Sequence, residues 1–290
     1  MNLTTKPKRQ FEVFYQPLVC LTTGRISGFE ALLRWRHPTR GYISPVRFIP
    51  IAEETGLIAP LGSWVLKTAI AQMSKWQKTF SSTNQLEKTS QENLSPLPSQ
   101  KKPPQQSCLK PQPYPLKMAV NVSAKQFIQV DLVAQIKQML KEAQLNPNHL
   151  KLEITESLLI ENFEQIIPIL KELNQLGIEL AIDDFGTGYS SLGRLQILPI
   201  DTLKIDRCFV SQIDRSSEKL EMVRAIASMA AALKMRTVVE GIETPNQLTI
   251  LQNLNCNEGQ GYYFAKPLNS SSITALLENN PHWMHHFAGR

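Results

Sequence analysis

Short apolar runs alternate with longer segments of helical spacing along most of the chain. The apolar runs that we interpret as strands are 13–19, 26–31, 118–122, 150–154, 180–183, 203–206, 237–240 and 262–264. In the longer segments an apolar residue returns every three or four positions, as in a helix with one buried face; these segments are 61–80, 124–143, 163–176 and 217–233. The alternation predicts an α/β fold with a mainly parallel sheet.

The first two strands are an exception to this alternation. Residues 20–25 separate them and are too few for a crossover helix, so we expect an antiparallel hairpin. Three helix boundaries have a chemical cause: Pro45 suits a first turn, Ser123 can cap the helix after it, and Gly177 suits a left-handed exit.

One stretch interrupts the pattern inside what we expect to be a single domain. Residues 81–115 are rich in Ser, Gln, Lys and Pro and have almost no periodic apolar residues, which predicts a flexible surface insertion. It is either a tolerated insertion, the simpler interpretation, or a docking or regulatory loop. We place the domain at 11–275, with an N-terminal tail at 1–10 and a C-terminal tail at 276–290.

Composition narrows the class of protein. With 290 residues and 42% hydrophobic content, the chain can bury a large core. Part of the net charge of +6 comes from lysines in the N-terminal tail and the insertion, and no basic stripe with interleaved aromatics is present, so we expect no DNA partner. The four cysteines form no Cys-x-x-Cys pair, and no apolar run reaches the roughly 20 residues of a membrane helix. We therefore expect a cytoplasmic protein.

Acidic or amide side chains follow the apolar part of five predicted strands. They are Glu30, Asn121, Glu153, the pair Asp183 and Asp184, and Glu240. Because the carboxyl ends of barrel strands open at one face, we expect these side chains to converge there. Any one of these side chains, taken alone, is explained by the simpler interpretation of a solvated strand end. Acids that converge from several strands, however, need a compensating cation to stay ionised together.

The donor atoms favour a hard cation. All of these side chains offer oxygen, and no Cys or His stands at a predicted strand end, which favours Mg²⁺ or Mn²⁺ over zinc. The adjacent Asp183 and Asp184 can serve two ions at once. Two ions roughly 4 Å apart are a common device for attack on a phosphodiester, so we expect two ions here.

A lysine and a glycine-rich segment accompany the acids. Alternation places Lys204 on the same side of its strand as Asp206. Lys204 is either a solvated strand end or a cation that orients water or stabilises charge on phosphate, with Asp206 holding it in place. The Asp-Phe-Gly at 184–186 resembles a protein-kinase motif, but the companion motifs are absent. We interpret it as a mobile loop that positions Asp183 and Asp184.

Nine short motifs, in order, cover nearly the whole chain. They are YQPL at 15–18, FEALLRWRHP at 29–38, FIPIAEETGLI at 48–58, AVNVSAKQF at 119–127, LEITES at 152–157, DDFGTGYSSL at 183–192, LKID at 203–206, VEGIET at 239–244 and QGYYFAKPL at 260–268. Each is weak alone, but their order and spacing are specific. The sequence resembles the EAL-domain cyclic di-GMP phosphodiesterases, named for the tripeptide that stands here as Glu30-Ala31-Leu32.

The resemblance implies a modified TIM (β/α)8 barrel with one antiparallel strand. It also implies hydrolysis of cyclic di-GMP to linear pGpG by two-metal activation of water, without a covalent enzyme intermediate. The implied metal ligands are Glu30, Asn121, Glu153 and Asp183 for one ion, and Asp183, Asp184 and Glu240 for the other. Lys204 resembles the lysine that contacts the attacking water, so the catalytic candidates are Lys204, Glu30, Asp183, Asp184 and Glu240.

The resemblance also assigns residues around the metal ligands. Those similar to substrate contacts are Gln16, Arg34 and Gln260, and Asp206 is a further substrate-binding candidate. The charge and forked donors of Arg34 suit a phosphate oxygen. Glu156 and Glu243 resemble supports of the 184–190 loop.

Alternatives to an active enzyme stay open at this point. Some EAL domains have lost catalysis and act as cyclic di-GMP receptors, and a protein-interaction module without nucleotide affinity is a further alternative. Degenerate members usually lack a metal ligand, whereas every matched position is retained here, which favours an enzyme.

The resemblance bears on assembly as well. The family often dimerises through helices beside the 184–190 loop, so a homodimer is one expectation. The 81–115 insertion is longer than the family usually has, and the sensor or cyclase domain often found upstream is missing from this sequence. We therefore expect either a stand-alone enzyme or a fragment of a larger regulator.

Overall fold

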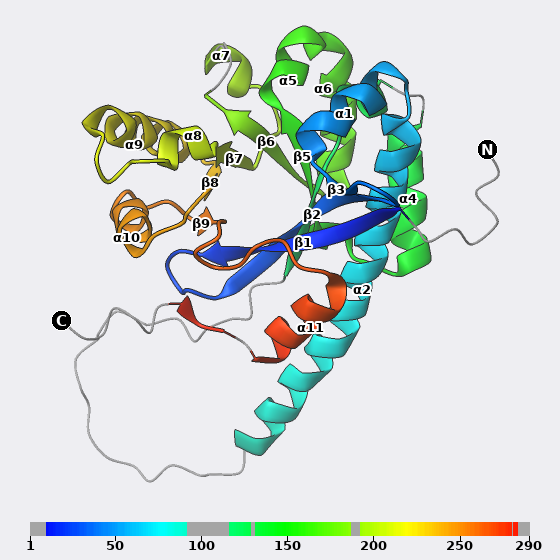
Figure 1. The fold of residues 1–290 in the computed structure, drawn as a ribbon, viewed down its shortest axis with the longest axis horizontal. Helices are drawn as coiled ribbons and strands as arrows, with labels where there is room; N and C mark the ends of the chain where they lie inside the picture. The colour runs from blue at the N-terminus through cyan, green and yellow to red at the C-terminus, as the bar shows by residue number, and fades with distance from the viewer. Residues whose placement is uncertain (1–9, 92–115, 129–130, 187–191, 280, 284–290) are drawn as a thin grey trace.

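The computed structural model describes residues 10–91, 116–128, 131–186, 192–279 and 281–283. Within them, the strands are β1 Phe11–Cys20, β2 Ile26–His37, β3 Gly41–Ile43, β4 Lys117–Asn121, β5 Leu150–Thr155, β6 Glu179–Phe185, β7 Thr202–Ile205, β8 Arg236–Val239 and β9 Glu258–Gly259. The helices are α1 Pro45–Glu54, α2 Ile58–Gln91, α3 Ala124–Phe127, α4 Leu132–Ala143, the 3₁₀ turn Pro147–His149, α5 Glu156–Glu161, α6 Phe163–Gln175, α7 Leu192–Leu195, α8 Arg207–Val210, α9 Ser217–Ala232, α10 Pro245–Asn253 and α11 Ser270–Asn279. Apart from β3, the strands close into a barrel with helices around it (Figure 1).

Strand β1 closes the ring and runs antiparallel to both of its neighbours. It pairs with β2, where Gln16 lies opposite Glu30, and with β9. The remaining adjacent pairs of the ring are parallel. The predicted modified TIM barrel with one antiparallel strand is therefore confirmed, and so is the predicted hairpin of the first two strands.

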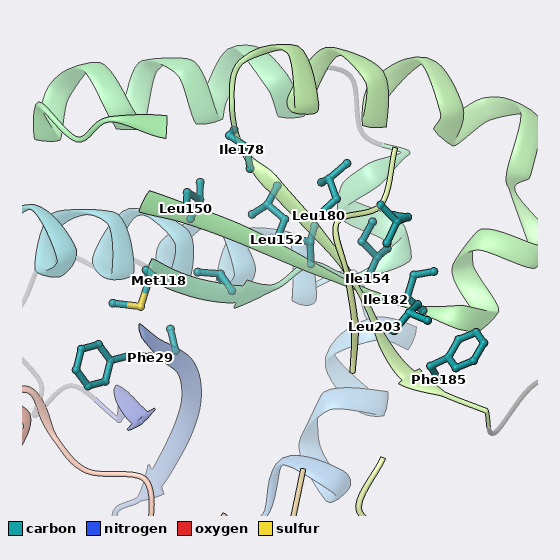
Figure 2. Packing of buried hydrophobic residues seen from close by; sticks show 14 of the residues in the cluster. Phe29, Met118, Leu150, Leu152, Ile154, Ile178, Leu180, Ile182, Phe185 and Leu203 are labelled. Carbon is teal, nitrogen blue, oxygen red and sulfur yellow. The ribbon is translucent and has the colours of Figure 1, made fainter. Parts of the chain in front are cut away.

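Strand alternation separates apolar from polar side chains across the barrel wall. Leu152, Leu180 and Ile182 are fully buried between the strands and the surrounding helices (Figure 2). Successive side chains of a strand point to opposite faces, so the intervening Glu153 and Asp183 point into the barrel. The same alternation that builds the outer core thus delivers the acids to the interior.

A second group of charges lies inside the barrel toward the amino ends of the strands. Lys151 Nζ lies 3.6 Å from Glu179 and 3.5 Å from Glu258, and Arg236 lies 3.1 Å from Glu258. Lys117 also pairs with Glu179. Because each of these two carboxylates has two cationic partners, this end of the interior needs no bound cation to balance its acids.

One predicted strand is wrong. Residues 262–264 form a turn, and the last strand of the ring is β9. β9 has no apolar run because its Glu258 side chain belongs to the interior charges. The ring of Phe264 instead packs 5.5 Å from that of Trp283, so local packing explains the aromatic residues.

Strand β2 extends beyond Glu30, which lies inside the strand rather than at its end as predicted. Pairing with the parallel strand β4 stops at Ala31, and β2 then continues against β1 and β3. Glu30 therefore still lies at the face where the parallel strands end. The sequence did not predict β3, because a strand this short carries no periodic pattern.

The helices follow the predicted segments with one break. The predicted helix 124–143 is two helices, α3 and α4, because Asp131 adopts a left-handed conformation with φ 77°. The three predicted boundaries are confirmed: Pro45 opens α1, Ser123 is the N-cap of α3, and Gly177 has φ 88° after α6.

Helix α2 reaches into the predicted insertion. It continues to Gln91, so 81–91 are helical rather than irregular, whereas 92–115 lie outside the described residues. A helix here is compatible with the polar composition, because Ser, Gln and Lys all have a workable helix propensity. Helix α11 likewise extends through Asn279, into the predicted C-terminal tail.

Truncating a core side chain should destabilise the barrel. We expect Leu180→Ala to lower the free energy of unfolding by about 3 kcal/mol, because the Leu180 side chain is completely buried. Urea unfolding measures this change. Ile197→Ala is the matched control, since Ile197 is 58% exposed and its truncation should change stability by less than about 0.5 kcal/mol. Equal effects of the two substitutions would contradict the packing described above.

Candidate active site

A buried lysine lies at the centre of the predicted acidic residues. Lys204 Nζ lies 2.7 Å from Glu153 Oε2, 2.9 Å from Asp183 Oδ1, 2.8 Å from Glu240 Oε1 and 3.8 Å from Glu30 Oε1. These carboxylates come from β5, β6, the end of β8 and β2, and the Lys204 side chain is only 1% exposed. Acids far apart in the sequence therefore meet at one point, as predicted. We call these five residues the acidic cluster.

Two amide side chains hold both oxygens of Glu30. Asn121 Nδ2 donates to Glu30 Oε1 at 2.7 Å, and Gln260 Nε2 donates to Glu30 Oε2 at 2.6 Å. Gln260 Nε2 also contacts Gln16 Oε1 at 2.9 Å, and Gln16 Nε2 donates to the carbonyl of Ala265. Among the described residues, the buried Gln260 Oε1 has no hydrogen-bond partner, so it is an acceptor that a ligand can use.

The acidic cluster holds more negative charge than one ammonium balances. Burial raises the pKa of Glu240 to about 7, although Lys204 beside it acts in the opposite direction. Burial also raises the pKa of Glu153 well above its usual value. For Lys204, burial lowers the pKa, but the surrounding carboxylates outweigh burial and hold the pKa well above its usual value. The lysine is therefore charged, and further positive charge would stabilise the ionised acids.

The raised pKa of Glu240 predicts a pH effect on the metal-free protein. Its pKa is about 7 in the folded state and 4.5 for an ordinary glutamate, so folding takes up a proton at pH values between these two. This contribution to stability is present below pH 4.5 and is lost as the pH rises through about 7. We expect the stability of Glu240→Gln to fall less between pH 4.5 and about 7 than that of the parent protein. Urea unfolding in chelator at several pH values tests this, and an unchanged pH profile in the variant would contradict it.

Asp184 completes a group of oxygen donors. Ligand oxygens of Asp183, Asp184 and Glu240 all lie within 4.8 Å of one another. Asp184 has φ 53°, and its backbone N–H donates to Asp183 Oδ1 at 3.1 Å. This left-handed residue explains why the register of β6 against β7 shifts between Ile182 and Phe185. An all-oxygen donor set of this spacing fits a hard divalent cation.

The two predicted loop supports, Glu156 and Glu243, differ in burial and in what they contact. Glu156 is buried, and its Oε2 accepts from the backbone N–H of Gly186 at 3.1 Å, where the chain leaves β6. Glu243 is exposed and faces the cavity described below. Because 187–191 lie outside the described residues, support of the loop by Glu243 stays a prediction.

The predicted contact between Asp206 and Lys204 is wrong. Asp206 Oδ1 accepts from the backbone N–H of Cys208 at 2.8 Å and thereby caps α8. Within the described residues, the ion pairs of Lys204 go to the carboxylates of the acidic cluster instead. The strand ends at Ile205, so alternation no longer decides the direction of the Asp206 side chain.

A cavity of about 280 Å³ opens beside the acidic cluster. Its lining contains Gln16, Glu30, Arg34, Asp183, Glu240, Glu243 and Gln260, all of which the sequence predicted. The Arg34 side chain is half-buried, its Nη1 donates to the Leu33 carbonyl, and burial lowers its pKa whereas Glu30 raises it. The predicted substrate contacts, apart from Asp206, therefore share one cavity with the acids.

Other lining residues were missed by sequence reasoning. They are Leu32, Arg207, Gly241, Gly261, Tyr262 and Pro267. Adjacency was an available signal, because Arg207 follows a predicted substrate contact and Gly241 follows a predicted metal ligand. Tyr262 was interpreted as part of a strand. It is instead 58% exposed, with Lys266 Nζ lying 5.3 Å from the centre of its ring.

Among the helices that the structure describes, none combines the length and the hydropathy that crossing a bilayer requires.

Comparisons with known proteins agree with this architecture. The chain is 38% identical over 268 residues to the cyclic di-GMP phosphodiesterase NbdA of Pseudomonas aeruginosa, covering 92% of this chain and 30% of the relative. It is 36% identical over 259 residues to the cyclic di-GMP phosphodiesterase PdeR of Escherichia coli, covering 89% and 34%. The chain thus spans about a third of the length of these curated relatives.

A solved structure matches over nearly its whole length. The PaMucR phosphodiesterase in complex with c-di-GMP superposes with a TM-score of 0.78 and 36% identity, covering 92% of this chain and 95% of that one. The profile of the EAL domain matches residues 3–102 and 104–267. With barrel, acidic cluster and profile in agreement, the chain belongs to the EAL domain family.

Proposed function

We propose that this chain is a divalent-metal-dependent phosphodiesterase that hydrolyses cyclic di-GMP to linear pGpG. The observation that carries the proposal is the convergence of four carboxylates on the Lys204 ammonium beside a cavity. Relatives named cyclic di-GMP phosphodiesterases support this choice of substrate.

The donor set of the cluster supports two divalent ions. We assign Glu30, Asn121, Glu153 and Asp183 to one ion, and Asp183, Asp184 and Glu240 to the other. Asn121 fits as a ligand only with its amide turned, because its Nδ2 donates to Glu30 and its oxygen must face the ion. Ions bound there would activate water and neutralise charge on the phosphate.

The protein side chains then position the reactants. A water oxygen bonds to phosphorus, the bond from phosphorus to the 3′-oxygen breaks, and this oxygen takes up a proton, which leaves pGpG with a 5′-phosphate. The three donors of the Lys204 ammonium each face a carboxylate, and ions that took over one of these acids would leave a donor free to orient the water. Arg34, half-buried in the cavity wall, binds a phosphate oxygen, and Gln260 Oε1 accepts a hydrogen bond from the nucleotide.

Calorimetry with Ca²⁺ in place of Mg²⁺ tests nucleotide recognition separately from turnover. We expect cyclic di-GMP to bind in the presence of Ca²⁺ and to bind much more weakly in chelator. A domain that binds cyclic di-GMP but does not cleave it with Mn²⁺ would be a receptor and would contradict the enzyme proposal. A domain without measurable affinity would instead favour a protein-interaction module.

A further inference from the structure

A second arginine, besides Arg34, lines the cavity. Arg207 is the first residue of α8, directly after the Asp206 that follows β7 (Figure 1). Its side chain is exposed and forms part of the wall that Glu240 and Glu243 also line. Within the described part of the chain, the Arg207 guanidinium has neither a hydrogen bond nor an ion pair. It differs in this from Arg34, which donates to a backbone carbonyl.

The backbone beside Glu240 fixes the stem of Arg207. Gly241 has φ 73°, and a Cβ atom built on it would lie 2.6 Å from the Cβ of Arg207. The chain that leaves the acidic cluster therefore packs directly against Arg207, and only glycine allows this approach. The close packing ties the position of Arg207 to that of Glu240. The Arg207 side chain is nevertheless exposed, and it belongs to the lining of the cavity.

The charges of the cavity indicate what Arg207 binds. Its wall carries the carboxylates Glu30, Asp183, Glu240 and Glu243 and two cations, Arg34 and Arg207. Arg207 forms no ion pair with these carboxylates within the described residues. Its guanidinium is therefore available to a ligand oxyanion, whose geometry its forked donors match. The proposed substrate has two phosphodiesters. Only one of them can occupy the acidic cluster during cleavage, so the other needs a cation elsewhere in the cavity.

We propose that Arg207 binds the second, uncleaved phosphodiester of cyclic di-GMP and thereby positions the first one at the acidic cluster. The proposal rests on the proposed function and deepens it. Arg207 acts as a substrate-positioning residue, because it contacts the half of the ring that does not react. Substrates that contain a single phosphodiester should not depend on it.

The test compares Arg207→Ala, Arg207→Lys and the parent on two substrates with Mn²⁺. With cyclic di-GMP, we expect Arg207→Ala to raise KM about tenfold and to change kcat by less than about threefold, since a charge-assisted contact is lost. Arg207→Lys should recover part of the affinity. With bis(p-nitrophenyl) phosphate, which has one phosphodiester, the kcat/KM of Arg207→Ala should fall by no more than about twofold. Arg215→Ala is the matched control, because the Arg215 side chain is 83% exposed and lies outside the cavity lining.

Two results would overturn the proposal. One is a change of less than twofold in KM for cyclic di-GMP, and the other is an equal loss on both substrates. If the parent protein turns over neither substrate, the proposed function fails, and calorimetry with cyclic di-GMP and Ca²⁺ then decides the role of Arg207. A tenfold weaker affinity of Arg207→Ala would support binding of the second phosphate, and equal affinity, or no affinity in the parent, would refute it.

Discussion

Glu30→Ala is expected to reduce turnover of cyclic di-GMP by about a thousandfold. Glu30 approaches the acidic cluster through Oε1, and both of its oxygens are held by amide donors, so its position is fixed before any ligand binds. Loss of a metal ligand removes several kcal/mol of charge stabilisation, and each 1.36 kcal/mol is a factor of ten in rate. Initial rates with Mn²⁺ measure the change. Asp183→Asn should behave in the same way, because Asp183 belongs to both proposed ligand sets.

Glu12→Ala is the matched control for Glu30→Ala. Glu12 lies on the adjacent strand β1, but its carboxylate accepts from Tyr42 at the surface, 3.0 Å away and outside the acidic cluster. We expect this variant to keep its rate within about twofold. Near-native turnover by Glu30→Ala, or an equal loss in Glu12→Ala, would rule out Glu30 as a metal ligand.

Lys204→Met is expected to have two separable effects. With metal, kcat should fall by about a hundredfold or more while the affinity for cyclic di-GMP changes little, because Lys204 is proposed to act on the attacking water. Without metal, the variant should be destabilised by about 3 kcal/mol, since loss of the Lys204 ammonium leaves buried carboxylates unpaired. Mn²⁺ should restore more stability to the variant than to the parent, because the ions replace the missing charge. Rate measurements and thermal unfolding with and without Mn²⁺ test both effects.

Lys151→Met offers a matched control inside the same barrel. Lys151 is equally buried, but its partners are Glu179 and Glu258, among the second group of charges. This variant should also lose stability, yet Mn²⁺ should stabilise it no more than it stabilises the parent. The folded fraction should keep the kcat of the parent. If Lys204→Met lowers only affinity, or if both variants respond alike to Mn²⁺, Lys204 has no special role at the metal site.

Much of the site followed from strand alternation. Glu153 and Asp183 each follow an apolar run in which every second side chain faces the helices. The sequence pattern alone therefore directs these two acids into the barrel. The antiparallel hairpin followed from a connection too short for a helix. Both inferences rest on local features, namely periodicity and chain length, and both were correct.

Other features depend on tertiary contacts that no local pattern encodes. β9 pairs through its backbone with β1 and β8 while its Glu258 side chain contacts Lys151 and Arg236 in the interior, and a strand of this length leaves no apolar run to detect. Asp206 caps a helix instead of contacting Lys204, which depends on where β7 ends. Arg207 lies in the cavity wall beside Gly241, and this close contact joins the start of α8 to the segment that follows β8, which no local pattern encodes.

The proposed activity requires carboxylates from separate strands to hold divalent ions that act on cyclic di-GMP. Chromatography of the products after incubation of the purified protein with cyclic di-GMP and Mn²⁺, with and without chelator, tests this most directly. We predict complete conversion to pGpG with Mn²⁺ and none with chelator in excess. Intact cyclic di-GMP in both samples, or equal conversion in both, would contradict the account.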